Sequence, residues 1–333
     1  MDSAKKVLVT GAGGFIGSHL VTFLKKKGYW VRGVDIKEPE FGVTDADDFR
    51  LLDLRRWEAC LEATDGVEEV FALAADMGGM GFISAHHAQI LHNNSLINLH
   101  TLEAAHQNGV KRYLYTSSAC IYPEHLQVNA DVTPLKEEDA YPAFPQDAYG
   151  WEKLVSERLC THYREDYGIN TRIVRFHNIF GERGTWEGGR EKAPAAMCRK
   201  VALAKLTGNS EIEIWGDGEQ TRSFCYIDDC VEGIFRLMQS DFVEPLNLGQ
   251  DRMVTINQLA DIVGEISGVK IEKKHVDGPQ GVRGRNSDNT KLREVLHWEP
   301  AVSLEDGLRT TYQWIEQEVA RSLEMKPLAG KAV

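Results

Sequence analysis

Three residues that can take part in a proton transfer lie in two short stretches of the sequence. Tyr149 and Lys153 are four residues apart, so on a helix both side chains share one face. An ammonium beside a phenol lowers the pKa of the phenol, so we expect Tyr149 to accept a proton from a hydroxyl group. Ser118 follows the apolar run 113–116 and can place its hydroxyl beside Tyr149. A Tyr-x-x-x-Lys pair alone is common by chance, and a surface pair is the ordinary alternative.

Cys120 and Lys192 are candidates for a second pair of acid–base groups. Cys120 lies two residues after Ser118, and a thiol with a reference pKa near 8.5 exchanges protons at neutral pH. Lys192 follows a glycine-rich loop and directly precedes a predicted helix. Inverting a carbon centre requires one group that removes a proton and another that returns it from the opposite face. The ordinary alternatives are a small buried cysteine and a solvated lysine.

A glycine-rich turn after the first strand predicts a dinucleotide site. The segment 10–17 contains glycines at the positions where a backbone turns sharply and approaches a pyrophosphate at a helix N-terminus. Asp35 ends the next strand, where its carboxylate can bind ribose hydroxyls and repel a 2′-phosphate, so NAD is favoured over NADP. Asp53, after a third short strand, suits an adenine contact. The residues that we expect to bind the cofactor are Gly11, Gly14, Phe15, Ile16, Gly17, Asp35, Asp53, Tyr149 and Lys153. No metal is expected.

The elements that must position these residues alternate between short apolar strands and amphipathic helices. Such strands without period-two alternation predict an α/β fold with a doubly wound parallel sheet. The expected strands are 7–10, 30–35, 70–74, 113–116 and 172–176, with helices at 16–27, 85–108 and 148–167. We therefore expect a dinucleotide-binding domain over 1–177, with a returning segment near 224–240, and a smaller substrate-binding domain over 178–333.

The order of glycine turn, strand-end serine and Tyr-x-x-x-Lys resembles the extended short-chain dehydrogenase/reductase family, which has a Rossmann-type fold. The resemblance covers nearly the whole chain and implies a catalytic triad of Ser118, Tyr149 and Lys153. Four blocks, 74–81, 118–123, 188–196 and 281–289, are similar to GDP-hexose epimerases of that family.

This similarity implies that Cys120 and Lys192 are the acid–base pair for inversion, acting on a sugar that NAD transiently oxidises. It further implies a homodimer, formed by the helices 85–108 and 148–167. Of the implied substrate residues, Arg222 and Arg283 suit a diphosphate, because a guanidinium binds phosphate in a bidentate manner. The substrate contacts implied in this way are Gly78, Ser118, Ala119, Cys120, Asn178, Glu191, Lys192, Ala193, Lys200, Gln220, Thr221, Arg222 and Arg283.

The amino-acid composition argues against some classes of binding partner. The formal net charge of −12 argues against nucleic acid or an anionic membrane as the main partner. The sequence has no run of about 18 apolar residues that could cross a bilayer. The six cysteines show no CxxC spacing, and with the short start before the first strand they favour a cytoplasmic enzyme.

Three alternatives stay open. An epimerase–reductase that forms GDP-fucose carries a similarly placed cysteine, but it would use NADPH and a histidine in place of Lys192. A simple 4-epimerase would not exchange carbon-bound protons with solvent. A non-catalytic NAD-binding sensor would have no need for the two acid–base pairs.

Overall fold

The computed structural model describes residues 4–325, and its centre is a parallel sheet of seven strands. The strand order is β11-β6-β5-β4-β1-β2-β3, and every neighbouring pair is parallel. The strands are β1 (Lys6–Thr10), β2 (Trp30–Asp35), β3 (Asp48–Leu51), β4 (Glu69–Ala72), β5 (Arg112–Ser118), β6 (Asn170–Phe176) and β11 (Pro245–Leu248). The predicted α/β fold class is therefore confirmed.

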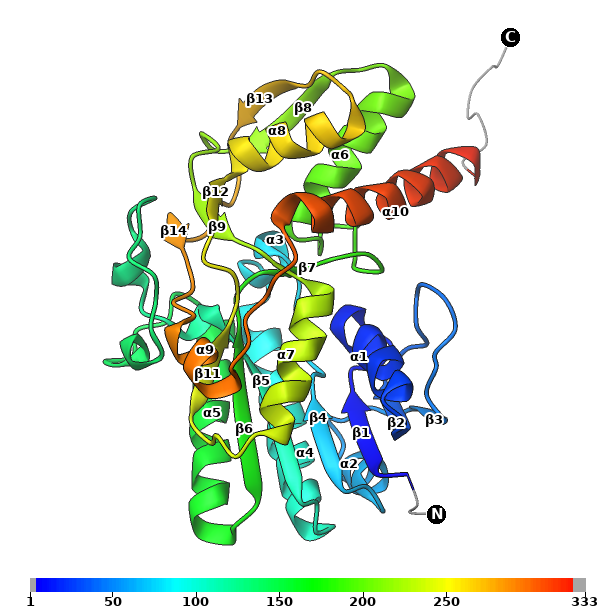
Figure 1. Cartoon of the computed structure of the whole chain (residues 1–333), viewed down its shortest axis with the longest axis vertical. Coiled ribbons are helices and arrows are strands. Elements are labelled where there is room, and N and C mark those ends of the chain that lie inside the picture. Colours follow the sequence, from blue (N-terminus) through cyan, green and yellow to red (C-terminus); the bar gives the residue numbers. More distant parts are fainter. Residues whose placement is uncertain (1–3, 326–333) are drawn as a thin grey trace.

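Helices cover both faces of this sheet (Figure 1). Val7 and Val9 of β1 belong to one apolar core with residues of α1 and α7, whereas Leu8 belongs to a second core with residues of α2 and α4. Because successive side chains of a strand point to opposite faces, one continuous apolar strand serves two cores. The covering helices are α1 (Phe15–Lys26), α2 (Trp57–Thr64), α4 (His87–Gln107), α5 (Ala148–Tyr167) and α7 (Ile227–Gln239).

A smaller group of elements lies beyond the carboxyl ends of the sheet strands (Figure 1). Its helices are α6 (Ala193–Thr207), α8 (Ile256–Ser267) and α10 (Leu304–Met325). Its paired strands are β8 (Glu211–Trp215) with β13 (Glu272–Val276), and β9 (Thr221–Ser223) with β12 (Met253–Thr255) and β14 (Gly284–Arg285). The remaining elements are α3 (Met80–Ile83), α9 (Thr290–Leu296), β7 (Ile179–Phe180), β10 (Cys225–Tyr226) and the 3-10 turns η1 (Ala119–Ile121), η2 (Glu124–Gln127) and η3 (Glu137–Ala140).

The chain returns to the large sheet after it has begun the smaller group. Helix α7 packs in the same core as α1, and β11 adds an edge strand beside β6, with Leu246 opposite Val174. The division at residue 177, with a return near 224–240, stays a prediction, and the part of the chain that returns extends to Leu248 at the end of β11. Within residues 4–325, no helix is long and apolar enough to span a membrane.

Candidate active site

One cavity of about 880 Å³ lies between the sheet and the smaller group of elements. It is lined by the glycine turn after β1, the ends of β2, β4 and β5, the start of α5, and the segments around Lys192 and Arg222. Nearly all the residues predicted from the sequence line this cavity, although they are spread over more than 200 positions of the chain. Thr221 and Arg283 are not among the lining residues.

The glycine turn has the close backbone packing that a dinucleotide cradle needs. Gly11 has φ 70°, in the left-handed region that favours glycine. A β-carbon at Gly17 would collide with the carbonyl oxygen of Gly11, so α1 can begin this close to β1 only with glycine at position 17. Helix α1 has no side-chain cap at Gly14, which leaves its N-terminal N–H groups for a ligand. Phe15 and Ile16 line the cavity at this helix start.

Asp35 ends β2 beside this turn. Its Oδ2 atom accepts a hydrogen bond from the Gly13 N–H at 3.0 Å, and Oδ1 accepts one from the Ile36 N–H at 2.7 Å. Burial raises the pKa of Asp35, and the backbone hydrogen bonds from Lys37, Gly13 and Ile36 act against that rise. A carboxylate fixed at this point fits the adenosine ribose of NAD and disfavours a phosphate there.

Asp53 lines the same end of the cavity but is already paired. Its Oδ2 atom lies 2.7 Å from Nη2 of Arg55, and its Oδ1 atom also accepts a hydrogen bond from the Arg55 N–H at 3.0 Å. An adenine contact by Asp53 stays a prediction.

Helix α5 carries Tyr149 and Lys153, and both of its ends are capped. The Asp147 side chain accepts a hydrogen bond from the Gly150 N–H at 2.8 Å, and Gly168 ends the helix in the left-handed conformation. Within this helix the Lys153 amine is buried; it donates to the Thr116 carbonyl at 3.0 Å and lies 5.5 Å from the centre of the Tyr149 ring.

The pKa of Tyr149 does not follow the expectation from the sequence. Burial raises the pKa of this phenol well above its ordinary value, and Cys120 and Glu152 raise it further, while hydrogen bonding with the Ser118 hydroxyl acts in the opposite sense. The net shift of this pKa is therefore upward in the chain by itself, opposite to the lowered pKa expected from the sequence. The physical reason is that the loss of hydration outweighs the effect of the amine, whose own pKa is lowered by burial.

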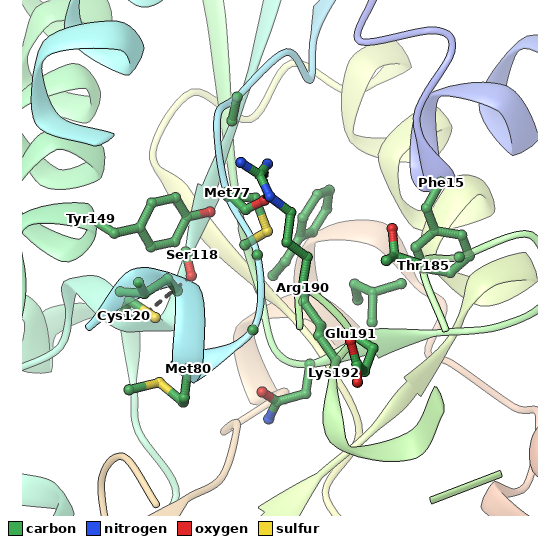
Figure 2. Close-up of a pocket in the computed structure, with 18 of the residues that line it drawn as sticks. Phe15, Met77, Met80, Ser118, Cys120, Tyr149, Thr185, Arg190, Glu191 and Lys192 are labelled. Carbon is green, nitrogen blue, oxygen red and sulfur yellow. Dashed lines mark hydrogen bonds between the residues drawn. The ribbon is translucent and has the colours of Figure 1, made fainter. Parts of the chain in front are cut away.

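A tight turn after β5 places Cys120 beside Ser118. Ser118 Oγ accepts a hydrogen bond from the Cys120 N–H at 3.2 Å, which caps η1. Figure 2 shows Tyr149, Ser118 and Cys120 on one side of the pocket, with Glu191 and Lys192 on the other side. The thiol of Cys120 also accepts a hydrogen bond from Arg285 at 3.3 Å.

Lys192 is the N-cap residue of α6, where a glycine-rich loop meets the helix. Burial lowers the pKa of its amine, with Cys120 and Cys230 acting in the opposite direction. In the part of the chain that the structure describes, this amine makes no hydrogen bond or ion pair. A desolvated amine of this kind gives up its proton more readily than a solvated lysine does.

Two arginines that have no carboxylate partner among residues 4–325 lie side by side in β9 and β14, where the smaller group of elements lines the cavity. Arg222 donates to the carbonyls of Thr221 and Val282, both at 2.7 Å, and Arg285 donates to Gln127 at 2.6 Å. Burial, together with the charge of Arg285, lowers the pKa of Arg222 to about 9. Two adjacent positive charges, one on the buried Arg285 and one on the partly buried Arg222, fit an anionic ligand such as a diphosphate.

Arg285 lines the cavity although the sequence analysis did not name it, whereas Arg283, which it named, is not among the lining residues. Arg283 makes an ion pair with Asp217, with nitrogen–oxygen distances of 2.7 and 2.9 Å. The two arginines are two positions apart in one block, and the sequence offers no signal that ranks them. A diphosphate contact by Arg283 stays a prediction.

The other predicted substrate residues differ in the hydrogen bonds that they already make within the protein. Thr221 donates its hydroxyl to the Ala130 carbonyl, and the Glu191 carboxylate accepts hydrogen bonds from the Gly189 N–H at 2.7 Å and from Arg199 at 3.0 Å. Gln220 is buried and its Oε1 atom has no hydrogen-bond partner in the described structure. The remaining predicted residues that line the cavity are Gly78, Ala119, Asn178, Ala193 and Lys200.

A parallel sheet with a glycine-rich first turn, facing a Tyr–Lys pair across one cavity, defines a dinucleotide-dependent enzyme of the Rossmann type. The model of the NAD dependent epimerase/dehydratase family matches residues 7–249, and the chain belongs to that family.

Individual proteins of known activity are also similar to this chain. A GDP-mannose 3,5-epimerase of Arabidopsis thaliana is 53% identical over 318 residues, which cover 95% of this chain and 83% of the relative. Among solved structures, a UDP-glucose 4-epimerase from Thermotoga maritima, with UDP-glucose, has a TM-score of 0.84 at 29% identity and covers 94% of this chain and 99% of its own. A UDP-glucuronic acid 4-epimerase from Bacillus cereus, in complex with UDP-glucuronic acid and NAD, has a TM-score of 0.79 at 27% identity with the same coverage.

Proposed function

We propose that this chain is an NAD-dependent GDP-mannose 3,5-epimerase that converts GDP-α-D-mannose to GDP-L-galactose, and to GDP-L-gulose where only carbon 5 is inverted. The relationship to plant enzymes of that activity supports the choice of substrate. Within the chain, one observation carries the reaction: the Cys120 thiol and the Lys192 amine line the cavity that also holds Tyr149 and Lys153.

The cofactor end of the cavity fits NAD, because the glycine turn and Asp35 together match an adenosine ribose and a pyrophosphate. When bound, NAD would accept hydride from carbon 4 of the hexose and return it at the end of the cycle. Tyr149 would take the proton of the 4-hydroxyl as that hydride leaves, with Ser118 orienting the hydroxyl. Lys153, held by the Thr116 carbonyl, would supply positive charge behind the phenol.

The second step belongs to Cys120 and Lys192. A ketone at carbon 4 acidifies the C–H bonds at carbons 3 and 5, because the electron pair left behind spreads onto the ketone oxygen as an enolate. One of the two groups would remove the proton from one face, and the other would return a proton to the opposite face, which inverts the centre. The configuration then remains inverted when the ketone is reduced again at carbon 4.

The substrate is held by charge in this proposal. Arg222 and Arg285 would bind the diphosphate of the GDP-sugar, since neither has a carboxylate partner in the described residues. Lys200 lies in the same half of the cavity and donates its amine to the Glu213 carbonyl at 2.5 Å.

The proposal also includes the oligomeric state and the cellular location of the enzyme. We expect a homodimer formed by α4 and α5, and a cytoplasmic location, where thiols stay reduced. All six cysteines are free in the structure, which agrees with a reducing compartment.

The test is conversion of GDP-mannose in heavy water, with analysis of the product sugar by NMR. Wild-type protein should form both products and place deuterium at carbon 5. Cys120→Ala and Lys192→Ala should each lose inversion by roughly 10²- to 10⁴-fold while they retain NAD. Tyr149→Phe should block the oxidation that precedes exchange, and serves as the control for a site that cannot begin the cycle.

Each alternative predicts a different outcome. Converted sugar without deuterium would point to a 4-epimerase and sink the enolate route. Net consumption of NADPH with a keto-sugar would point to an epimerase–reductase. Binding of NAD with no turnover of any GDP-sugar would leave only a sensor.

A further inference from the structure

Two loops from distant parts of the chain meet beside the cavity. One is the 76–81 loop after β4, and the other is the 188–192 loop, which leads into α6. The Gly79 N–H donates to the Arg190 carbonyl at 2.9 Å, and a β-carbon at Gly79 would collide with the carbonyl oxygen of Glu191. The two backbones can lie this close only because residue 79 is glycine.

The side chain of Arg190 makes a second connection between these loops. Its Nη1 atom lies 3.3 Å from Oδ1 of Asp76, and its guanidinium carbon lies 3.8 Å from the centre of the Phe82 ring. Figure 2 shows Arg190 extending from the loop that carries Glu191 and Lys192 toward Met77. A planar guanidinium that stacks on a ring and pairs with a carboxylate has its orientation set by both contacts.

The Asp76 carboxylate is itself fixed to α4 by two hydrogen bonds. Its Oδ2 atom accepts hydrogen bonds from Gln89 at 2.8 Å and from Asn93 at 2.9 Å. Burial raises the pKa of Asp76, but these hydrogen bonds and the charge of Arg190 outweigh that effect and hold the pKa below its ordinary value. The carboxylate therefore stays ionised at neutral pH and links Arg190 to a long helix of the large sheet layer.

The Asp76–Arg190 pair is poorly placed to serve the stability of the fold. The Arg190 side chain is 46% exposed, and ion pairs with such exposure contribute little to folding. Lys192 lies two residues further along the same loop, and its amine has no hydrogen bond or ion pair in the described residues. The position of that amine in the cavity therefore depends on the course of the loop backbone.

We propose that Arg190 is a positioning residue for Lys192: by joining Asp76 and Phe82 it holds the 188–192 loop against the 76–81 loop, so that the amine faces the hexose. This inference rests on the proposed function. It assigns to Arg190 no proton transfer of its own and no part in the oxidation at carbon 4.

The experiment separates the two half-reactions. Stopped-flow absorbance at 340 nm measures oxidation at carbon 4, and NMR in heavy water measures deuterium entering carbons 3 and 5. Arg190→Gln should lower the exchange rate on the order of 10- to 100-fold, since a displacement of about 1 Å can cost about 100-fold. The rate of oxidation should stay within about twofold of wild type. Arg190→Lys, which keeps the charge opposite Asp76, should recover part of the exchange.

A matched control and a double variant test whether the effect passes through Lys192. Arg252→Gln removes an exposed pair with Glu305 and lies outside the cavity lining, so it should exchange like wild type. In a Lys192→Ala background, Arg190→Gln should have no further effect on residual exchange, because the group it positions is gone. Asp76→Asn removes the other partner of the same ion pair and should lower the exchange rate as Arg190→Gln does. It replaces Arg190→Gln as the test if Arg190→Gln folds poorly.

The outcomes are distinguishable from failure of the proposed function. A wild-type protein that leaves GDP-mannose unchanged would overturn both. A wild-type protein that converts it, together with an Arg190→Gln variant that exchanges normally, would overturn only the role of Arg190. Equal losses of exchange and oxidation, or a full additional loss in the Lys192→Ala background, would also overturn it.

Discussion

A buried carboxyl group lies beside the amine that supports Tyr149. Glu152 Oε1 is 4.0 Å from the Lys153 amine, and the amide groups of Asn94 and Asn98 donate to the Glu152 oxygens at 2.9 and 3.0 Å. Burial lowers the pKa of Lys153, and Glu152 is the largest influence in the opposite direction, with Cys120 acting in the same sense as Glu152. Glu152 therefore helps Lys153 to keep its proton although the amine is buried.

Replacing Glu152 with Gln should change how the enzyme responds to pH. The amide keeps the shape but loses the negative charge, so the pKa of Lys153 should fall further. Lys153 would then lose its proton at a lower pH, and the alkaline limb of the kcat profile should move toward lower pH. The measurement is kcat for GDP-mannose conversion from pH 6 to 10, with the exposed Glu165→Gln on the same helix as control. An alkaline limb that stays in place would show that Glu152 does not support the charge of Lys153.

Between elements, a buried ion pair joins α5 to β6. Arg175 of β6 donates to the two Glu157 oxygens at 2.9 and 2.7 Å, and both side chains are almost completely buried. The Ser117 hydroxyl donates to the same carboxylate, which ties β5 to this pair. The helix that carries Tyr149 is thereby fixed to the strand beside the one that ends at Ser118.

Breaking the Glu157–Arg175 ion pair should lower the stability of the fold. Glu157→Gln leaves the Arg175 charge buried and unpaired, and we expect a loss of about 3–5 kcal/mol in the free energy of unfolding. Glu244→Gln removes an exposed partner of Arg164 and should change stability by about 1 kcal/mol at most. Urea denaturation followed by circular dichroism compares the two variants. Similar midpoints for both would mean that the buried pair does not anchor α5.

For the whole molecule, the outer surface of α4 and α5 presents an apolar area. Leu91 and Leu99 of α4 and Trp151 and Val155 of α5 are all exposed, Val155 to 64%. Exposed apolar side chains on two helices that pack against each other suit a helix-to-helix contact with a second copy of the chain. These are the two helices for which a homodimer was predicted.

A charge in this area should weaken the dimer. Val155→Glu would bury an unpaired carboxylate at the proposed contact, so the protein should sediment as a monomer at concentrations where wild type is a dimer. Val43→Glu changes an equally apolar residue that is 95% exposed on another surface, and should leave the assembly unchanged. Analytical ultracentrifugation of both variants and of wild type measures the oligomeric state. A Val155→Glu protein that remains dimeric would place the contact elsewhere.

The long elements of the fold could be predicted because their patterns are local. The strand over Trp30–Asp35 and the helix over Ala148–Tyr167 begin and end where the sequence analysis expected, since an apolar run and capped helix ends are local signals. The smaller group of elements was predicted only as a change of texture. Strands such as β7, β10 and β14 have two residues each, too few for any periodicity.

What the sequence by itself determined is the sheet, the glycine turn and the order of Ser118, Cys120, Tyr149, Lys153 and Lys192, because each follows from spacing within one element or one loop. Only the tertiary structure decided which of two neighbouring arginines enters the cavity. It also decided that burial outweighs Lys153 in setting the pKa of Tyr149, and that Arg190 meets Asp76 across 114 positions of the chain. Desolvation and contact depend on what other segments bring to the same place, and that information is absent from any local pattern.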